Sequence, residues 1–198
     1  MWNRKVAKGQ YGYLKKQKIW STARTLILFA LSLSIFAIGI KRTGSKENLL
    51  TVVAILGCLP AGRSAVNMIM FLRTQGCSKE VMAQIRTASD GMIQLYDMFF
   101  TSYEKNYPIS HMVINNHVVC GYAENSKMDS QGCEKHLNNY LKKGGCKSVA
   151  VKIFVDLEKY CEGINNLKRQ AETEPPRKES HLTNEEQEIL ENLLSIAL

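Results

Sequence analysis

The sequence has few prolines, glycines and aromatic residues. Its 198 residues include only four prolines and 13 glycines, which excludes a collagen-like or low-complexity chain. With 45% apolar and 8% aromatic residues, the chain can bury one moderate core but not two. It also has no Gly-rich phosphate loop, no Gly-x-Ser-x-Gly elbow, no His-Glu-x-x-His motif and no internal repeat. No motif therefore identifies a reaction, and we expect no cofactor.

Acidic residues are absent from residues 1–24, which carry seven lysines and arginines. This arm accounts for most of the formal net charge of +8. A nucleic-acid footprint needs bases clustered on a folded face, whereas these bases directly precede an apolar run. Bases at that position flank membrane-spanning helices and attract anionic headgroups by about 1 kcal/mol each. We therefore expect a basic juxtamembrane arm and no nucleic-acid partner.

The first of two apolar segments, Thr25–Ile40, has no charged residue, and Trp20 before it is typical of a headgroup boundary. A helix needs about 20 residues to cross the hydrocarbon. The segment reaches that length from Ile19 if Arg24 snorkels outward. A secretory signal peptide is the alternative, but the basic leader is long and no small-residue cleavage site follows the segment.

The second segment, Leu49–Leu72, follows a short polar loop and is interrupted by Pro60 and Arg63. A membrane helix tolerates a proline, but a guanidinium at the centre of a span costs about 2.5–3.5 kcal/mol. Three structures follow: the span ends near Gly62, the helix tilts, or Arg63 lines the polar interior of an oligomer. Together the segments predict a transmembrane hairpin over residues 25–72, with the lipid bilayer as partner.

Small residues at four-residue spacing mark a packing face on each helix. They are Ala30 and Ser34 in the first segment, and Gly57, Ala61 and Ala65 in the second. Such strips allow close approach within a hairpin or between subunits. Seven lysines and arginines precede the first segment and three lie in the loop, so the positive-inside rule places both termini in the cytoplasm and predicts a multi-pass protein of the cell membrane. In that reducing compartment we expect free thiols.

Residues 79–170 carry the pattern of a small cytoplasmic α/β domain. Apolar residues at intervals of three and four predict a helix from Ser78 to Lys105. Two strands, 109–115 and 118–122, are joined at Asn115-Asn116, and asparagine tolerates the positive φ of a hairpin turn. The last three predicted elements are a helix over 131–143, a strand over 148–155 and a helix capped by Asp156. The predicted fold class is α+β: a transmembrane hairpin, an αββαβα domain and a C-terminal amphipathic helix.

The C-terminal part consists of a Pro-rich linker, residues 171–181, which we expect to be flexible, and a helix over residues 182–198. Thr183 and Glu186 form a capping box. The apolar stripe of the helix comprises Ile189, Leu190, Leu193 and Leu194. A short helix is marginal alone, so it docks on its own domain, on a second copy or on another protein, or it stays disordered. For a partner-binding helix, we expect residues 182–198 to be removable without disturbing the core.

Two motifs have the residue types of a zinc site. His117-x-x-Cys120 and Cys133-x-x-His136 offer two thiols and two imidazoles, the ligands of a tetrahedral zinc ion. However, strand residues three apart point to opposite faces, so His117 and Cys120 converge only if a turn intervenes. Cys120 with His111 or His117 is also a candidate thiol–imidazole pair. Buried thiols with exposed histidines are the alternative.

Carboxylates and a lysine follow the predicted strands. Glu124, Lys127 and Asp129 come after the second strand, and Asp156 comes after the last, which makes them candidates for acid–base chemistry. A solvated loop and helix capping are the alternatives. The order of elements resembles the core of restriction-endonuclease-like nucleases, which carry an Asp on one central strand and a Glu-x-Lys on the next. This chain has no Glu-x-Lys, and its hairpin strands carry no acid before Glu124.

The sequence thus predicts a membrane-anchored interaction, sensor or adaptor module. It acts through contacts with a protein partner or with a second copy of itself. The alternatives are a membrane-tethered nuclease-like hydrolase and an oligomeric membrane effector or pore. Whether the chain is an enzyme stays open.

Overall fold

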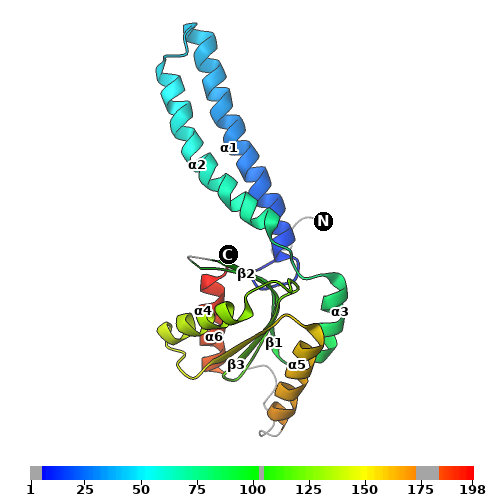
Figure 1. Ribbon diagram of the computed structural model, residues 1–198. Helices are drawn as coiled ribbons and strands as arrows, with labels where there is room; N and C mark the ends of the chain where they lie inside the picture. The colour runs from blue at the N-terminus through cyan, green and yellow to red at the C-terminus, as the bar shows by residue number, and fades with distance from the viewer. Residues whose placement is uncertain (1–5, 103–104, 173–182) are drawn as a thin grey trace. The chain divides into compact units, whose positions relative to one another are not determined.

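The computed structural model describes residues 6–102, 105–172 and 183–198, and it divides into two compact units (Figure 1). One unit is a helical hairpin, Leu14–Thr74. The other is an α/β domain formed by the chain up to Tyr13 and by Gln75–Leu198. The hairpin is therefore inserted into the domain sequence. Most of the predicted linker lies outside the described residues, as do Arg4 and Lys5 of the predicted arm.

Two long helices form the hairpin: α1, Tyr13–Thr43, and α2, Leu49–Arg73. Both are long and apolar enough to span a membrane. The side chain of Asn48 caps the start of α2, and Pro60 is accommodated inside the helix. Because α1 begins at Tyr13, the second half of the predicted basic arm is helical.

Small and hydroxyl side chains form the seam between α1 and α2. The buried positions include Ser21, Thr25, Ser32, Gly39, Ala54, Ala61 and Ser64. A Cβ atom at Gly57 would lie 2.8 Å from Ser32 Oγ, so this glycine permits the close approach. Gly57 and Ala61 therefore pack within the hairpin, one of the two alternatives, while Ala65 is half-buried.

Ala30 and Ser34 are exposed, and Ser32 lies in the seam instead, so the strip predicted on the first helix does not pack within the hairpin; of its two alternatives, packing between subunits stays a prediction. Ser32 can face the partner helix because its hydroxyl donates to the Leu28 carbonyl of its own helix at 3.1 Å. Its polar group is thereby satisfied inside the seam.

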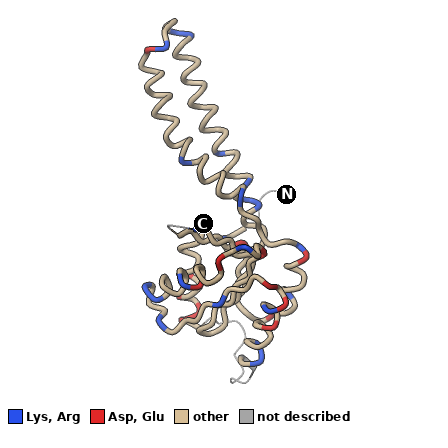
Figure 2. The backbone as a smooth tube through the Cα atoms, in the orientation of Figure 1, with Lys and Arg blue, Asp and Glu red and all other residues tan. Residues whose placement is uncertain are grey.

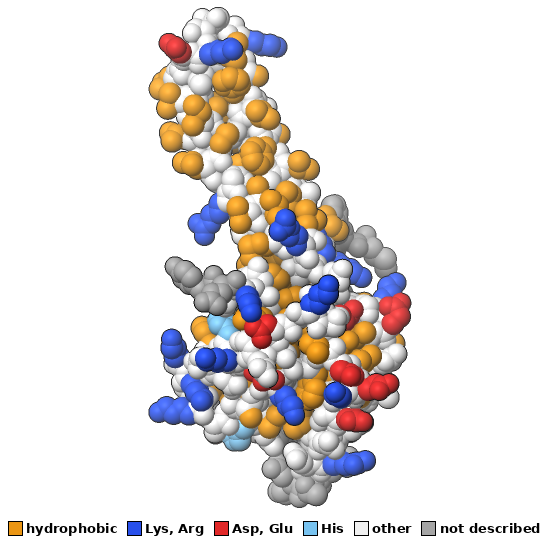
Figure 3. All heavy atoms as spheres, viewed as in Figure 1, with side chains coloured by type: hydrophobic (Ala, Val, Ile, Leu, Met, Phe, Trp, Pro, Cys, Tyr) orange, Lys and Arg blue, Asp and Glu red, His pale blue; other side chains and the backbone are white. Residues whose placement is uncertain are grey.

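Besides Lys15, Lys16, Lys18 and Arg73 near its two ends, the hairpin has charged residues at two levels. One is the tip, with Lys41, Arg42, Lys46 and Glu47. At the other, Arg24 Nε donates to Ser64 Oγ at 3.2 Å, and the exposed Arg63 is the neighbour of that serine. Between these levels the hairpin carries no charge (Figure 2). Most of its outward-facing side chains there are apolar (Figure 3). Leu26, Leu33 and Leu59, for example, are 64%, 62% and 70% exposed.

A four-stranded sheet in the order β1-β2-β3-β4 forms the centre of the α/β domain. Its strands are β1, Ile93–Thr101; β2, Asn106–Asn115; β3, Val118–Tyr122; and β4, Ala150–Phe154. Neighbours among the first three strands are antiparallel, and β4 runs parallel to β3 after a crossover through α4, Ser130–Lys143. The predicted hairpin of β2 and β3 is confirmed, with Asn116 at a φ of +50° in its turn.

Helices cover both faces of the sheet (Figure 1). On one face, α4 and α6, Asn184–Ile196, close a core that contains Leu137 and Ile189. On the other, α3, Lys79–Ala88, and α5, Leu157–Glu172, close a core that contains Ile85 and Tyr160. The predicted helix over 131–143, the last strand and the helix that Asp156 caps are confirmed as α4, β4 and α5.

The predicted helix from Ser78 to Lys105 is wrong. In the structure, α3 ends at Ala88, Gly91 takes a φ of +85°, and the chain continues as β1. Because β1 is buried on both faces, its apolar residues do not alternate, and their intervals of three and four match a helix by coincidence. The domain order before the C-terminal helix is therefore αβββαβα rather than αββαβα.

Candidate functional site

The four candidate zinc ligands are not brought together. Cys120 lies in the core under α3 and α5, whereas Cys133 lies in the core on the opposite face of the sheet. Burial raises the pKa of the Cys120 thiol to about 11 and that of Cys133 to about 12, so both stay protonated at neutral pH. His117 contacts Glu185, and the His136 ring lies 5.9 Å from that of Tyr107, centroid to centroid. Among the described residues, no three His, Cys, Asp or Glu side chains are grouped as a metal site.

Glu124 and Asp156 follow the carboxyl ends of the neighbouring parallel strands β3 and β4. Both are engaged in local structure. Glu124 Oε1 accepts the Ser78 N–H, at the start of α3, at 2.8 Å. Asp156 Oδ1 accepts the Glu158 N–H at 3.0 Å and so caps α5, as predicted. The two carboxylates therefore anchor the first turns of the helices that cover one face of the sheet.

Lys127 and Asp129 lie at a separate hollow of about 290 Å³. Asp129 caps α4 through the Gly132 N–H at 2.9 Å and forms an ion pair with Lys105 at 2.7 Å. The Lys105 ammonium, together with the Gly132 N–H, holds the pKa of Asp129 below its ordinary value. Helix capping thus accounts for Asp129, while the backbone N–H of Lys127 donates to Asn125 within the same loop.

The C-terminal helix α6 docks on its own domain. Ile189 and Leu193 are 1% and 0% exposed, and Leu190 and Leu194 pack half-buried against the same core. This is the first of the alternatives left open by the sequence. The expectation that residues 182–198 can be removed without disturbing the core is wrong, because this face of the sheet would lose one of the two helices that cover it and the core would lose Ile189 and Leu193.

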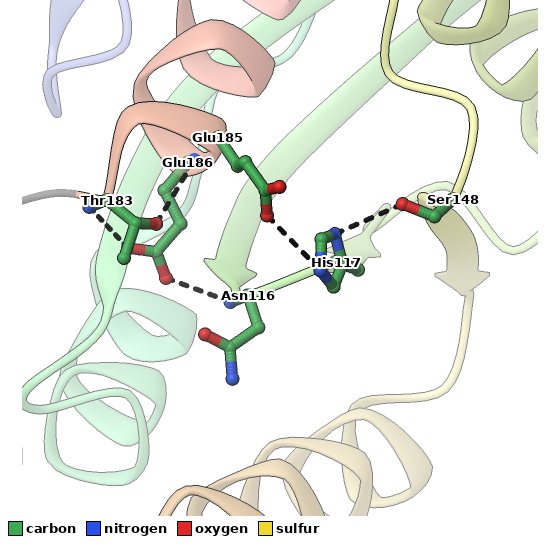
Figure 4. A network of polar contacts seen from close by, with 6 residues as sticks. All are labelled: Asn116, His117, Ser148, Thr183, Glu185 and Glu186. Atoms are coloured by element: carbon green, nitrogen blue, oxygen red, sulfur yellow. Dashed lines mark hydrogen bonds and ion pairs between the residues drawn. The ribbon is translucent and has the colours of Figure 1, made fainter.

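Polar contacts hold the start of α6 to the turn between β2 and β3 (Figure 4). Glu186 is 3% exposed and accepts the Asn116 N–H at 2.8 Å and the N–H of the helix N-cap at 3.2 Å. Glu185 lies 3.2 Å from His117 Nε2, and His117 Nδ1 lies 3.3 Å from Ser148 Oγ. A hydroxyl, an imidazole and a carboxylate in this order resemble a nucleophile, a base and an orienting acid. The last two side chains are 47% and 69% exposed, however, and an exposed pair adds only about 0–1 kcal/mol. We assign these contacts to the docking of α6.

Asp97 of β1 binds the chain on both sides of the hairpin. Its side chain is 3% exposed, and its φ is +55°. Asp97 Oδ2 accepts the Gly12 N–H at 2.9 Å, and Oδ1 accepts the Cys77 N–H at 2.8 Å. Gly12 directly precedes α1, and Cys77 comes four residues after the end of α2. One carboxylate thus holds the segment that enters the hairpin and the segment that leaves it, an arrangement that we call the Asp97 clasp.

The segment before α1 is bonded to the domain at two further points. The Tyr96 N–H donates to the Gly9 carbonyl at 2.7 Å, and Lys8 Nζ donates to the Ala197 carbonyl after α6. Partial burial lowers the pKa of Lys8. Residues that we predicted to lie against the membrane surface are therefore part of the α/β domain.

A buried histidine lies beside the clasp. His111 of β2 is opposite Tyr96 in the sheet register, with ring centroids 4.5 Å apart. His111 Nδ1 is 2.7 Å from the Tyr160 hydroxyl of α5, and Nε2 has no hydrogen-bond partner among the described residues. Burial lowers the pKa of His111 to about 3, so the ring is neutral at physiological pH. His111 therefore pairs with Tyr160 rather than with Cys120, and the contacts run from the clasp through Tyr96 and His111 to α5.

No protein family, no curated protein and no solved structure matches this chain. The fold and the clasp must therefore carry the functional argument. Asp97 was missed in the sequence because it fell inside the predicted helix. The available signal was a single acid in the apolar run Leu95–Phe100, since an aspartate among buried residues is almost always paired.

Proposed function

We propose that this chain is an integral membrane protein whose hairpin crosses the bilayer twice and whose α/β domain acts at the cytoplasmic face as a sensor module, through protein contacts. The observation that carries the proposal is the outer surface of the hairpin, which is apolar between two charged levels. An exposed apolar surface of this extent marks a membrane or protein contact. Charge at both ends of a helical hairpin fits the two headgroup regions of a bilayer.

Arg24 and Arg63, which lie at one level of the hairpin, indicate how deeply the hairpin enters the bilayer. The charge-free stretches are Thr25–Ile40 in α1 and Leu49–Gly62 in α2, or about 24 and 21 Å of helix. These lengths fall short of the roughly 30 Å of hydrocarbon, and snorkelling of Arg24 and Arg63 to one interface supplies the remainder. This geometry favours the alternative in which the span of α2 ends near Gly62 over a pore-lining Arg63.

The Asp97 clasp supports a sensor rather than a passive anchor. A passive anchor needs only a covalent connection to its domain. Here both connections to the hairpin are bonded to one carboxylate of β1. The next residue, Tyr96, contacts His111, which is bonded to α5. A displacement of either connection therefore acts on β1 and on the helices that pack against it.

Lysine at the middle of the hairpin is expected to prevent membrane insertion. Leu33 and Leu56 are 62% and 59% exposed, so lysine at either position would be nearly neutral if the hairpin lay in water. In hydrocarbon each substitution costs about 3 kcal/mol. The double variant Leu33→Lys, Leu56→Lys should therefore lose most of its carbonate-resistant membrane fraction, while Ser45→Lys in the loop should keep it. An unchanged membrane fraction in the double variant would refute the bilayer placement.

The orientation is measured in the same cells with a membrane-impermeant maleimide. A cysteine introduced as Ser45→Cys should react in intact cells, and a cysteine introduced as Glu188→Cys in the domain should react only after permeabilisation. The reverse pattern would invert the proposed topology.

After gentle detergent extraction, the protein is expected to be part of a homo-oligomer or of a complex with another protein. The full chain has a mass of 22.4 kDa. If it acts through protein contacts, its particle mass after subtraction of the detergent should correspond to a homo-oligomer or to a complex of fixed stoichiometry, as measured by multi-angle light scattering. A uniform monomer at the lowest detergent concentration that keeps the protein dispersed would contradict this part of the proposal.

A further inference from the structure

A groove in the hairpin combines an apolar wall with one cation. It has a volume of about 460 Å³ and is lined by Gln17, Trp20, Arg24, Ile27 and Leu28 of α1 and by Phe71 of α2. Small-molecule sites in proteins have volumes of about 300–1,000 Å³ and are mostly apolar with a few polar groups. The groove therefore has the size and composition of a ligand site.

A hydrogen bond across the two helices of the hairpin orients the cation of this groove, the Arg24 guanidinium. Arg24 Nε donates to Ser64 Oγ at 3.2 Å, and Ser64 Oγ lies 2.8 Å from the hydroxyl of the buried Thr25. The terminal nitrogens of Arg24 have no hydrogen-bond partner within the described residues, and the side chain is exposed. A guanidinium oriented through Nε presents its remaining N–H groups as a fork, which matches the oxygens of a phosphate.

The position of Arg24 favours a phospholipid over a free anion. Arg24 is the last charged residue before the charge-free stretch of α1, and Ile27 and Leu28 lie one turn further along it. A free phosphate would use the guanidinium alone, whereas a phospholipid also covers the apolar wall with an acyl chain. Trp20, at 59% exposure, lies on the other side of Arg24, and tryptophan is enriched at headgroup level.

The surrounding charge favours a headgroup with a net negative charge. From Val6 to Lys46 the chain contains no acid, while Lys15, Lys16 and Lys18 lie on the α1 turns before Arg24. Each basic residue near a membrane surface attracts anionic lipid, whereas the ammonium of a zwitterionic headgroup cancels much of this attraction. We propose that the groove binds an anionic phospholipid, with its phosphate on Arg24 and an acyl chain along Ile27, Leu28 and Phe71. This inference rests on the proposed membrane insertion of the hairpin.

Quenching of Trp20 by brominated lipids tests the site in the full chain. The chain has two tryptophans, and the background substitution Trp2→Phe leaves Trp20 as the only reporter. The protein is reconstituted into vesicles of phosphatidylcholine with phosphatidylglycerol, and one lipid at a time is brominated. We expect brominated phosphatidylglycerol to quench Trp20 about fivefold more effectively per lipid than brominated phosphatidylcholine, since one headgroup–cation contact gives a factor of this size.

Variants at Arg24 and Arg63 distinguish lipid binding in the groove from a general attraction of anionic lipid by the basic residues. In Arg24→Gln the two brominated lipids should quench Trp20 about equally, and Arg24→Lys should retain part of the preference for phosphatidylglycerol. Arg63→Gln removes an equal charge at the same level but does not line the groove, so it should keep the fivefold preference. Equal quenching by both lipids in the unsubstituted protein, or an equal loss in the Arg24 and Arg63 variants, would overturn the site. Absence of quenching by either lipid would instead contradict the membrane insertion of the hairpin.

Discussion

Replacing Asp97 with alanine is expected to lower the free energy of unfolding of the α/β domain by about 3–5 kcal/mol. A hydrogen bond to a charged group contributes about 1.5–3 kcal/mol, and Asp97 accepts two such bonds in a site where its side chain is only 3% exposed. Alanine also tolerates the φ of +55° less well than aspartate or asparagine does. Urea unfolding of the full chain in detergent, followed by the near-UV circular dichroism of its tyrosines, measures the loss.

Asp97→Asn is the graded variant for this prediction. It keeps one acceptor oxygen and the left-handed backbone conformation, so its stability should fall between those of the unsubstituted protein and Asp97→Ala. Asp90 is exposed, and Asp90→Ala should change stability by less than about 0.5 kcal/mol. An Asp97→Ala protein as stable as the Asp90 control would show that the clasp contributes nothing.

The clasp also makes a local prediction, because Cys77 is 2% exposed while its N–H is bound to Asp97. If the clasp holds this segment, the Cys77 thiol should react with maleimide faster in Asp97→Asn than in the unsubstituted protein, as measured by peptide mass spectrometry. The buried Cys133 is the internal reference, since it lies on the opposite face of the sheet and should keep its slow rate.

Acid is expected to destabilise the α/β domain through His111. Burial lowers the pKa of His111 from its ordinary 6.5 to about 3, so between these values the unfolded chain binds a proton that the folded protein does not. Stability from this residue is therefore complete above about pH 6.5 and is lost as the pH falls towards 3. The expected loss is about 2 kcal/mol between pH 7 and pH 5, and on the order of 5 kcal/mol over the whole window.

Two variants isolate the contribution of His111 from that of the carboxylates. His111→Gln is expected to be less stable at pH 7 but to lose about 2 kcal/mol less between pH 7 and pH 5, because glutamine does not titrate. Tyr160→Phe removes the hydrogen bond to Nδ1 but leaves the ring buried, so the pH dependence should persist. Identical pH profiles for His111→Gln and the unsubstituted protein would mean that this imidazole does not resist protonation in the folded state.

The capping signals and the β2–β3 hairpin were predictable because each depends on residues close in the chain. Asp156 before α5, Thr183 with Glu186 before α6 and the asparagines of the turn act on their own neighbours. The strand β1 was not predictable in this way. It pairs with β2, its residues Leu95, Met98 and Phe100 pack in the core closed by α4 and α6, and its Asp97 is buried against the segments before α1 and after α2. This burial on both faces removes the alternation that identifies a strand.

In the candidate site, too, the sequence identified local features, whereas contacts between distant residues required the structure. The carboxylates and cysteines chosen from the sequence were noticed for their spacing, but the sheet separates Cys120 from Cys133 and helix starts account for Glu124 and Asp156. The Asp97 clasp joins residues 85 and 20 positions apart in the chain. No local pattern identifies such contacts.

By itself, the sequence determined that two long apolar helices precede a small α+β domain, because length and hydropathy are properties of contiguous residues. It also determined where α5 and α6 begin, because a cap binds the first turn of its own helix. Only the tertiary structure decided that β1 is a strand, that α6 belongs to the core, and that one buried carboxylate binds the segment before α1 and the segment after α2. These features depend on pairing and burial between distant segments, and the cost of leaving a buried N–H or charge without a partner is what selects them.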